Sequence, residues 1–291
     1  MDLSGLYVAT LTPFNHDETL NTNDLTKLIE FNCQSELDGL YVGGSTGEAF
    51  LCSIEERIQL LEITADKAVK EKKLIAHIGD ISTRNSEILA KTVANLRYDA
   101  VSAVTPFYYP IGFEQLKNHY RDIIQKCGKP MVVYNFPAFA GVNLNGDQIS
   151  QLLNIDGVIA LKQTSANLYQ MEQITRQNPD KTVYNGFDEI LLSGLVAGAK
   201  GGIGSTYNIQ AQRIVELFKA INTNQVTKAT VLQGEVNVVI DTLIEEGVIP
   251  SLKYILKAKG VIENDTCRRP MNKLTSEGKN KLDRLIETTL F

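Results

Sequence analysis

Eight short apolar runs recur along the 291 residues of this chain, and helix-like stretches separate them. Each run has about the length of a β-strand, and most end in Gly, Thr, Ser, Asn or Pro. Strands that alternate with helices predict a parallel sheet, and eight is the number that closes a (β/α)8 TIM barrel. We therefore expect an α/β barrel with a C-terminal helical extension. The runs centre on Tyr7, Tyr41, Ile75, Val101, Val133, Ile159, Val183 and Ile203.

The segment after the second run shows helical spacing clearly. Ser53, followed three residues later by Glu56, predicts a capping box at the start of a helix. The apolar face of that helix is predicted to consist of Ile54, Ile58, Leu61 and Ala65.

No linker rich in Gly, Ser or Pro divides the chain. We predict a single domain over residues 1–291, with the barrel strands and intervening helices in 1–206. The last barrel helix and the C-terminal helices are expected in 207–291. The alternative is a doubly wound sheet, which usually carries G-x-G-x-x-G after its first strand. Here "LTPFN" occupies that place.

Composition argues against several classes of partner. Acidic residues outnumber basic ones by 34 to 29, so the formal net charge of −5 does not favour binding to nucleic acid. No window approaches the roughly 20 apolar residues of a membrane span, and "MDLSG" does not resemble a basic leader. The four cysteines and three histidines are scattered. This predicts free thiols in a reducing cytoplasm and no metal site.

Lys162 is the most unusual residue among the expected strand ends, where barrel enzymes gather their reactive groups. It ends the apolar run Val158–Leu161. Burial lowers the pKa of an amine, and a neutral amine attacks a ketone to form an imine. The alternative is a salt bridge to a neighbouring acid, and position alone does not decide between the two.

Three further strand ends carry polar groups. "GGSTGE" (Gly43–Glu48) could bind a carboxylate through amides and hydroxyls, or could be a tight turn that needs glycine. Tyr134 could transfer protons or simply pack. Asp188 and Glu189 could accept hydrogen bonds from a polyhydroxylated ligand, or could be a solvated pair. A 2-oxo acid would use the loop for its carboxylate, Lys162 for its ketone and Tyr134 for protons.

Several long motifs together resemble those of one enzyme family. "GGSTGEAF", "DAVSAVTPFYYP", "MVVYNFPA", "ALKQTS" and "GIGSTYN" are similar to the N-acetylneuraminate lyases of the dihydrodipicolinate synthase superfamily of class I aldolases. The resemblance implies a Schiff-base lyase that cleaves N-acetylneuraminate reversibly to N-acetylmannosamine and pyruvate. It implies no metal or organic cofactor, because the lysine itself serves as the electron sink.

The resemblance also implies a role for individual residues. Lys162 would form the Schiff base, Tyr134 would transfer protons, and Ser45 and Thr46 would hold the pyruvate carboxylate. Tyr108 is similar to a tyrosine that family members lend to a neighbouring subunit, so a homo-oligomer, commonly a tetramer, is expected. The pocket for the sugar part would be lined by Thr164, Gly186, Asp188, Glu189 and Ser205.

One position separates this chain from the dihydrodipicolinate synthases. Phe139 stands where those enzymes have an arginine that grips a substrate carboxylate. The difference favours an amino sugar over aspartate semialdehyde. Two alternatives stay open: another pyruvate aldolase, such as a 2-keto-3-deoxy sugar acid aldolase or a dihydrodipicolinate synthase, and a non-catalytic sugar-acid binding protein.

Overall fold

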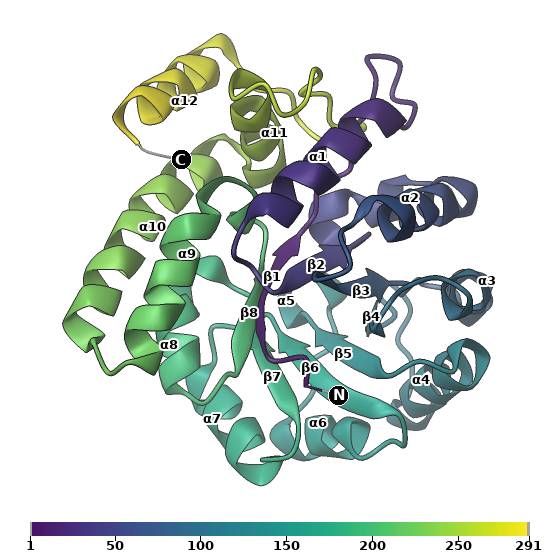
Figure 1. Cartoon of the computed structure of the whole chain (residues 1–291). Helices are drawn as coiled ribbons and strands as arrows, with labels where there is room; N and C mark the ends of the chain where they lie inside the picture. Colours follow the sequence, from purple (N-terminus) through teal and green to yellow (C-terminus); the bar gives the residue numbers. More distant parts are fainter. Residues whose placement is uncertain (1, 290–291) are drawn as a thin grey trace.

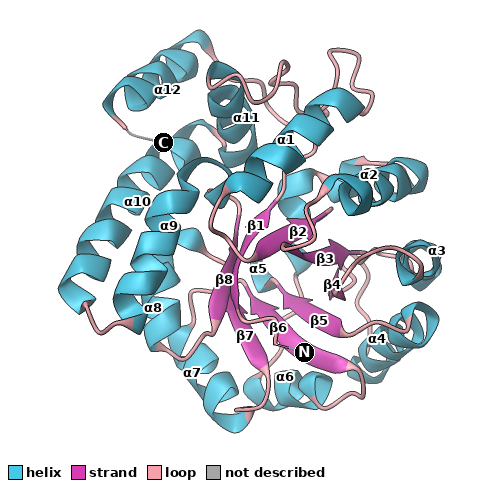
Figure 2. Cartoon of the chain, in the orientation of Figure 1, coloured by secondary structure: helices cyan, strands magenta, loops and turns pink. Residues whose placement is uncertain are grey.

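The computed structural model describes residues 2–289 and confirms the predicted barrel. Within these residues, eight parallel strands follow one another around a closed ring, and β8 pairs with β1 to complete it (Figure 2). Each predicted apolar run contains one strand. The strands are β1 (Gly5–Ala9), β2 (Gly39–Val42), β3 (Lys73–His77), β4 (Ala100–Val104), β5 (Met131–Asn135), β6 (Val158–Gln163), β7 (Thr182–Asn185) and β8 (Gly201–Gly204).

Helices surround the ring on its outer side (Figure 1). Their apolar faces pack on the outward-facing side chains of the strands and form the largest core of the protein. These helices are α1 (Thr22–Gln34), α2 (Ile54–Lys67), α3 (Thr83–Ala94), α4 (Phe113–Cys127), α6 (Gly146–Leu153), α7 (Leu168–Gln177), α8 (Leu191–Val196) and α9 (Tyr207–Asn222). The short helix α5 (Pro137–Ala140) follows β5 and contributes none of the described residues of this core. Short 3-10 turns, η1 (Ser45–Gly47), η2 (Ala49–Leu51) and η3 (Asp188–Ile190), follow β2 and β7.

Helix α2 begins as predicted, and its predicted apolar face packs against the core. Ser53 and Glu56 form the predicted capping box. Leu61 is buried in this core, and Ile54, Ile58 and Ala65 are partly buried and pack against it. The sequence did not predict one further buried residue on this helix, Arg57. Its guanidinium donates to Asp80 and to the carbonyls of His77 and Gly79, which holds that side chain inside. The inward residues of α2 are Arg57, Leu60, Leu61 and Thr64.

Three helices follow the barrel and form the C-terminal extension: α10 (Val226–Glu246), α11 (Val248–Ala258) and α12 (Ser276–Thr288). They share a second apolar core with α1, built around Leu28, Leu243 and Leu252. In Figure 1 the extension covers the same side of the barrel as α1 and α9. Among the described residues, none of the helices combines the length and the apolar character needed to cross a bilayer.

The barrel interior is closed at the end where the strands begin. The segment before β1 runs across this end (Figure 1). The hydroxyls of Tyr7 and Tyr184 both donate to the carbonyl of Leu3, and all three residues are buried. Tyr7 and Tyr184 also pack edge to face, with 5.6 Å between ring centroids. The polar strand ends predicted to carry chemistry lie at the opposite end of the barrel.

Candidate active site

Lys162 lies inside the barrel near the carboxyl end of β6. In the sheet register it stands between Tyr134 on β5 and Tyr184 on β7. Its Nζ lies 4.4 Å from the ring centroid of Tyr134 and 4.5 Å from that of Tyr41. None of the ion pairs in residues 2–289 includes Lys162. The salt-bridge alternative is therefore not the arrangement found.

The surroundings of Lys162 favour a neutral amine. The residue is 5% exposed. Burial lowers the pKa of Lys162 to about 7, although the negative charge of Asp188 acts in the opposite direction. Near neutral pH a large part of this amine is consequently unprotonated, with a lone pair available to attack a carbonyl carbon.

Tyr134 places a protonated phenol beside this amine. Burial raises the pKa of Tyr134 to about 12, and the hydroxyls of Ser45 and Thr164 oppose the rise. The Tyr134 ring packs against Tyr41 and His77, with centroids at 6.3 and 6.0 Å. The buried Oγ1 of Thr164 lies near enough to act on this phenol, but it makes no hydrogen bond of normal geometry to a described residue. A polar ligand atom at this point would supply one.

The loop after β2 carries Ser45 and Thr46, both half-buried. Gly43 begins the loop with φ of 72°, a conformation that favours glycine. The Gly43 carbonyl lies 3.0 Å from Nδ1 of His77, whose Nε2 accepts the N–H of Val104 at 3.2 Å. With Nε2 as acceptor, we assign the proton to Nδ1. Burial lowers the pKa of His77 to about 3, so the ring stays neutral and fixes the start of the loop.

The turn after β7 contributes Asp188 and Glu189 and depends on a glycine. A Cβ at Gly186 would lie 1.9 Å from Oγ1 of Thr164, so only glycine fits there. Oδ2 of Asp188 accepts both the N–H and the hydroxyl of Thr206, at 2.8 and 2.7 Å. Burial raises the pKa of Asp188 to about 6. Glu189 is half-buried.

Six of the ten predicted site residues are linked to one another at this mouth by the contacts described above. Ser205 is half-buried, and the hydroxyl that binds Asp188 belongs to the next residue, Thr206. Tyr108 is 82% exposed, with its ring 4.9 Å from that of Tyr109. The residues that meet here are Ser45, Tyr134, Lys162, Thr164, Gly186 and Asp188.

Sequence reasoning missed three residues of the site: Tyr41, His77 and Thr206. Tyr41 and His77 sit within apolar runs and read as ordinary strand residues. The signal that could have found Tyr41 is the alternation of strand side chains, because residues of one parity face the barrel interior. Thr206 could have been added beside Ser205 only by knowing how the chain turns after β8.

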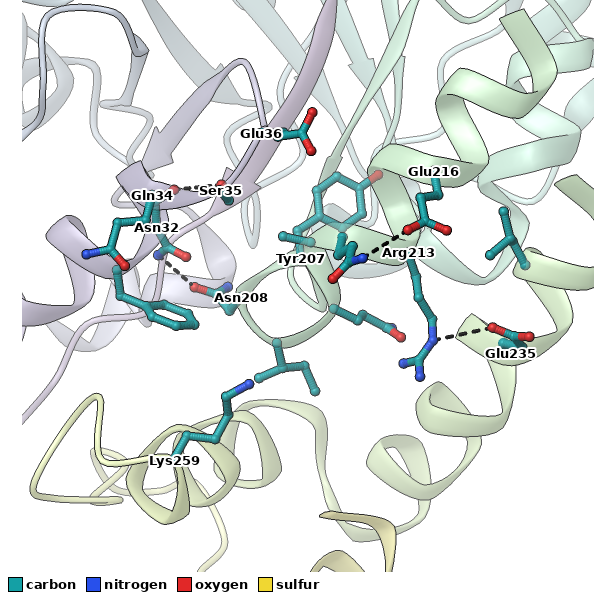
Figure 3. Close-up of a pocket in the computed structure, with 16 residues that line it drawn as sticks. Asn32, Gln34, Ser35, Glu36, Tyr207, Asn208, Arg213, Glu216, Glu235 and Lys259 are labelled. Atoms are coloured by element: carbon teal, nitrogen blue, oxygen red, sulfur yellow. Dashed lines mark hydrogen bonds and ion pairs between the residues drawn. The ribbon is translucent and has the colours of Figure 1, made fainter. Parts of the chain in front are cut away.

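A hollow of about 570 Å3 lies elsewhere, between α1, α9 and α10 (Figure 3). Asn32 and Asn208 line it and share a hydrogen bond of 3.2 Å, and Arg213 pairs with Glu235 at 3.4 Å. None of the predicted site residues lines this hollow. It is therefore separate from the site at the barrel mouth. Within the described chain, no group of three or more His, Cys, Asp or Glu is arranged to hold a metal ion.

Comparison with known proteins defines the class to which this barrel and its buried lysine belong. The chain belongs to the dihydrodipicolinate synthetase family, whose model matches residues 2–289. Two curated relatives are "N-acetylneuraminate lyase 2" from Escherichia coli O6:H1 and an "N-acetylneuraminate lyase" from Escherichia coli strain SMS-3-5. The first is 49% identical, covering 98% of this chain and 94% of the relative. The second is 53% identical, covering 92% and 91%.

A solved structure supports the same grouping. N-acetylneuraminate lyase from Fusobacterium nucleatum, complexed with pyruvate, is 35% identical and has a TM-score of 0.94. The match covers 99% of this chain and 98% of that one. Within its family the chain therefore groups with the N-acetylneuraminate lyases, and it is an enzyme of the lyase class.

Proposed function

We propose that the protein cleaves N-acetylneuraminate reversibly to N-acetylmannosamine and pyruvate through an imine on Lys162. The observation that carries the proposal is the buried, unpaired amine of Lys162, with a pKa near 7 and its Nζ 4.4 Å from the Tyr134 ring centroid. Curated relatives with about half of their residues identical carry the name of this activity. A pyruvate complex of a related lyase supports pyruvate as one product.

Bond making begins at C2 of the open-chain sugar acid. The neutral Nζ of Lys162 attacks this ketone carbon, and loss of water together with uptake of one proton gives a protonated imine. A base takes the proton of the C4 hydroxyl, the C3–C4 bond breaks, and its electron pair moves into the imine. N-acetylmannosamine departs. The remaining enamine takes a proton at C3, and water then hydrolyses the imine to release pyruvate and the free amine.

Tyr134 is the group proposed to move these protons. Its phenol, with a pKa of about 12, is a weak base at neutral pH. The hydroxyls of Ser45 and Thr164 lower that pKa, and a substrate carboxylate bound by the Ser45–Thr46 loop would assist the proton transfer. The unpartnered Oγ1 of Thr164 is available to bind substrate.

Two assays separate this activity from the nearest alternative. Purified protein should release pyruvate from N-acetylneuraminate and should not condense pyruvate with aspartate semialdehyde. Phe139 supports this choice of substrate, because it is 77% exposed and stacks on Phe136 at 4.2 Å, so its place offers no charge to a second carboxylate. Condensation without cleavage would identify a dihydrodipicolinate synthase instead. Failure of both assays would favour a different aldolase or a binding protein.

Changing the two carboxylates after β7 should affect the sugar half of the reaction alone. Asp188→Asn and Glu189→Gln weaken acceptors proposed for sugar hydroxyls, each bond contributing about 0.5–3 kcal/mol. We expect a higher KM for N-acetylneuraminate or a lower kcat. Borohydride trapping of pyruvate on Lys162 should not fall, because losing the Asp188 charge can only lower the pKa of this amine. Phe139→Arg is the companion variant: it should weaken cleavage of N-acetylneuraminate by adding charge at the mouth. Unchanged kinetics in both carboxylate variants would show that neither carboxylate contacts the sugar.

We also propose that the protein is a homo-oligomer, with a tetramer expected. Tyr108 supports this, because its ring is 82% exposed and its backbone has φ of 75°, which is uncommon outside glycine. A neighbouring subunit would give such a fixed, exposed ring a contact. Light scattering after size exclusion should give four times the 32.2 kDa of one chain. A monomer whose Tyr108→Ala variant has full activity would contradict both the assembly and the role of Tyr108.

A further inference from the structure

The C-terminal extension reaches the mouth of the barrel through one buried ion pair. Glu48, the last residue of the GGSTGE loop, and Lys253 of α11 have side chains that are both 0% exposed. Nζ of Lys253 donates to Oε1 of Glu48 and, at 2.8 Å, to the carbonyl of Thr266. The second carboxylate oxygen, Oε2, accepts the backbone N–H of Arg268 at 2.8 Å. Both oxygens of Glu48 are thus bonded to the extension.

Arg268 holds the segment that follows this loop. Its guanidinium donates to both carboxylate oxygens of Glu56, at 2.6 and 2.7 Å, and to the carbonyl of Leu51 at 2.8 Å. Phe14 packs beneath both cations, 4.5 Å from Nζ of Lys253 and 4.3 Å from Cζ of Arg268. The extension therefore fixes residues 48–56 at both ends, directly after the turn that carries Ser45 and Thr46.

Stability alone is a poor reason for this arrangement. Burying two charges costs about as much as their attraction returns, and a packed apolar pair often stabilises a fold equally well. The ion pair does fix the orientation of the Glu48 side chain and backbone, and the turn before Glu48 depends on that orientation. Glu48 has φ of 54°, a left-handed conformation that its surroundings must enforce, and it immediately follows η1. Moving its carboxylate would rotate the turn that presents Ser45 and Thr46.

We propose that Glu48 and Lys253 are positioning residues, which orient the Ser45–Thr46 turn toward the carboxylate of pyruvate. The inference rests on the proposed function and adds a role for the C-terminal extension in it. Thr12 completes the support of the turn, since its hydroxyl donates to the carbonyl of Gly47 at 2.7 Å. The turn is then held from β1 on one side and from the extension on the other.

The test uses a double variant of the full-length chain, Glu48→Gln with Lys253→Met. It removes both charges together, keeps the shapes similar and leaves no unpaired buried charge. The pyruvate concentration for half-maximal borohydride trapping on Lys162 should rise about tenfold, as expected when hydrogen bonds to a charged group are lost. Trapping at saturating pyruvate should fall by less than about threefold. If the ion pair only stabilised the fold, the double variant would show less trapping at saturating pyruvate, because less protein would be folded. The pyruvate concentration for half-maximal trapping would then be unchanged.

Lys257→Met is the matched control. Lys257 also lies on α11 and pairs with Asp265 at 2.8 Å, but its side chain is 42% exposed and neither partner bonds to the loop. The Lys257→Met variant should need the same pyruvate concentration for half-maximal trapping as the wild type. A second variant, Arg268→Lys, keeps the charge but loses the paired bonds to Glu56, and should raise half-saturation about threefold.

The outcomes distinguish the positioning role of Glu48 and Lys253 from the proposed lyase function on which it rests. If wild-type protein does not trap pyruvate at all, the proposed function fails. If wild type traps pyruvate, and the folded double variant and Arg268→Lys show wild-type pyruvate dependence, the positioning role is wrong and the function stands. Should the double variant not fold, Arg268→Lys decides alone: a wild-type result overturns the inference, and a raised half-saturation supports it.

Discussion

Replacing Lys162 with arginine will abolish both cleavage of N-acetylneuraminate and reductive trapping of pyruvate. A guanidinium remains protonated at all accessible pH values and cannot attack a ketone. We expect kcat to fall by at least roughly 10⁴-fold, the scale seen when a nucleophile is removed. Lys162→Ala should be equally inactive. Mass spectrometry after treatment with pyruvate and borohydride measures the result, since wild type should carry the added mass on Lys162 alone. Label on another residue, or an active Lys162→Ala, would refute the assignment.

The pH dependence of trapping gives an independent check on the same residue. Below its pKa the Lys162 amine carries a proton and has no lone pair to donate. The pKa of about 7 therefore predicts that the rate of imine formation rises with pH through neutrality and then levels off. A solvent-exposed lysine, with a pKa near 10.4, would show the rise about three pH units higher. The position of the rise thus measures the effect of burial.

Replacing Tyr134 with phenylalanine has the second largest expected effect. The ring and its packing against Tyr41 and His77 remain, whereas the hydroxyl is lost. Turnover should fall by roughly 10²–10⁴, the range for loss of a general acid–base group. Imine trapping should fall less, because it requires fewer proton transfers. Steady-state kinetics and trapping on the same preparation measure the two effects.

A second buried tyrosine provides the control for Tyr134→Phe. The hydroxyl of Tyr120 on α4 donates to the carbonyl of Ala103 at 3.2 Å and lies outside the barrel interior. Tyr120→Phe should lower thermal stability and leave kcat near the wild-type value. Equal activities for Tyr134→Phe and wild type would assign Tyr134 to packing.

The strands could be predicted from the sequence because of where they lie. A parallel strand buried on both faces reads as an unbroken apolar run, and turn-forming residues mark its end. The same logic identified Lys162, because a charged side chain at the end of such a run is exceptional. The burial of Arg57 on α2 could not be predicted in this way. Arg57 reads as a surface residue until Asp80 and two carbonyls are brought to it by the fold.

The missing parts of the site share a physical cause. The partner of Glu48 lies 205 residues further along the chain, and nothing in either local pattern joins them. The contact of the Thr206 hydroxyl with Asp188 joins residues 18 positions apart, and the local sequence does not show it. The local spacing of apolar residues predicts whether a residue is buried. It does not predict which distant residue will contact it.

Closure of the barrel at the amino ends of its strands predicts a fixed order of product release. Because Tyr7 and Tyr184 are both bonded to Leu3 at that end, reactants and products have to enter and leave through the mouth at the carboxyl ends of the strands. In the proposed mechanism pyruvate would stay bound to Lys162 at the inner end of the barrel, and the cleaved sugar would lie between it and solvent. The sugar would then have to leave first, and water could reach the imine to release pyruvate only afterwards. We therefore expect ordered product release, in which pyruvate leaves last. Pyruvate should bind the empty enzyme and inhibit competitively against N-acetylneuraminate. N-acetylmannosamine, which meets only the occupied enzyme, should inhibit without competing.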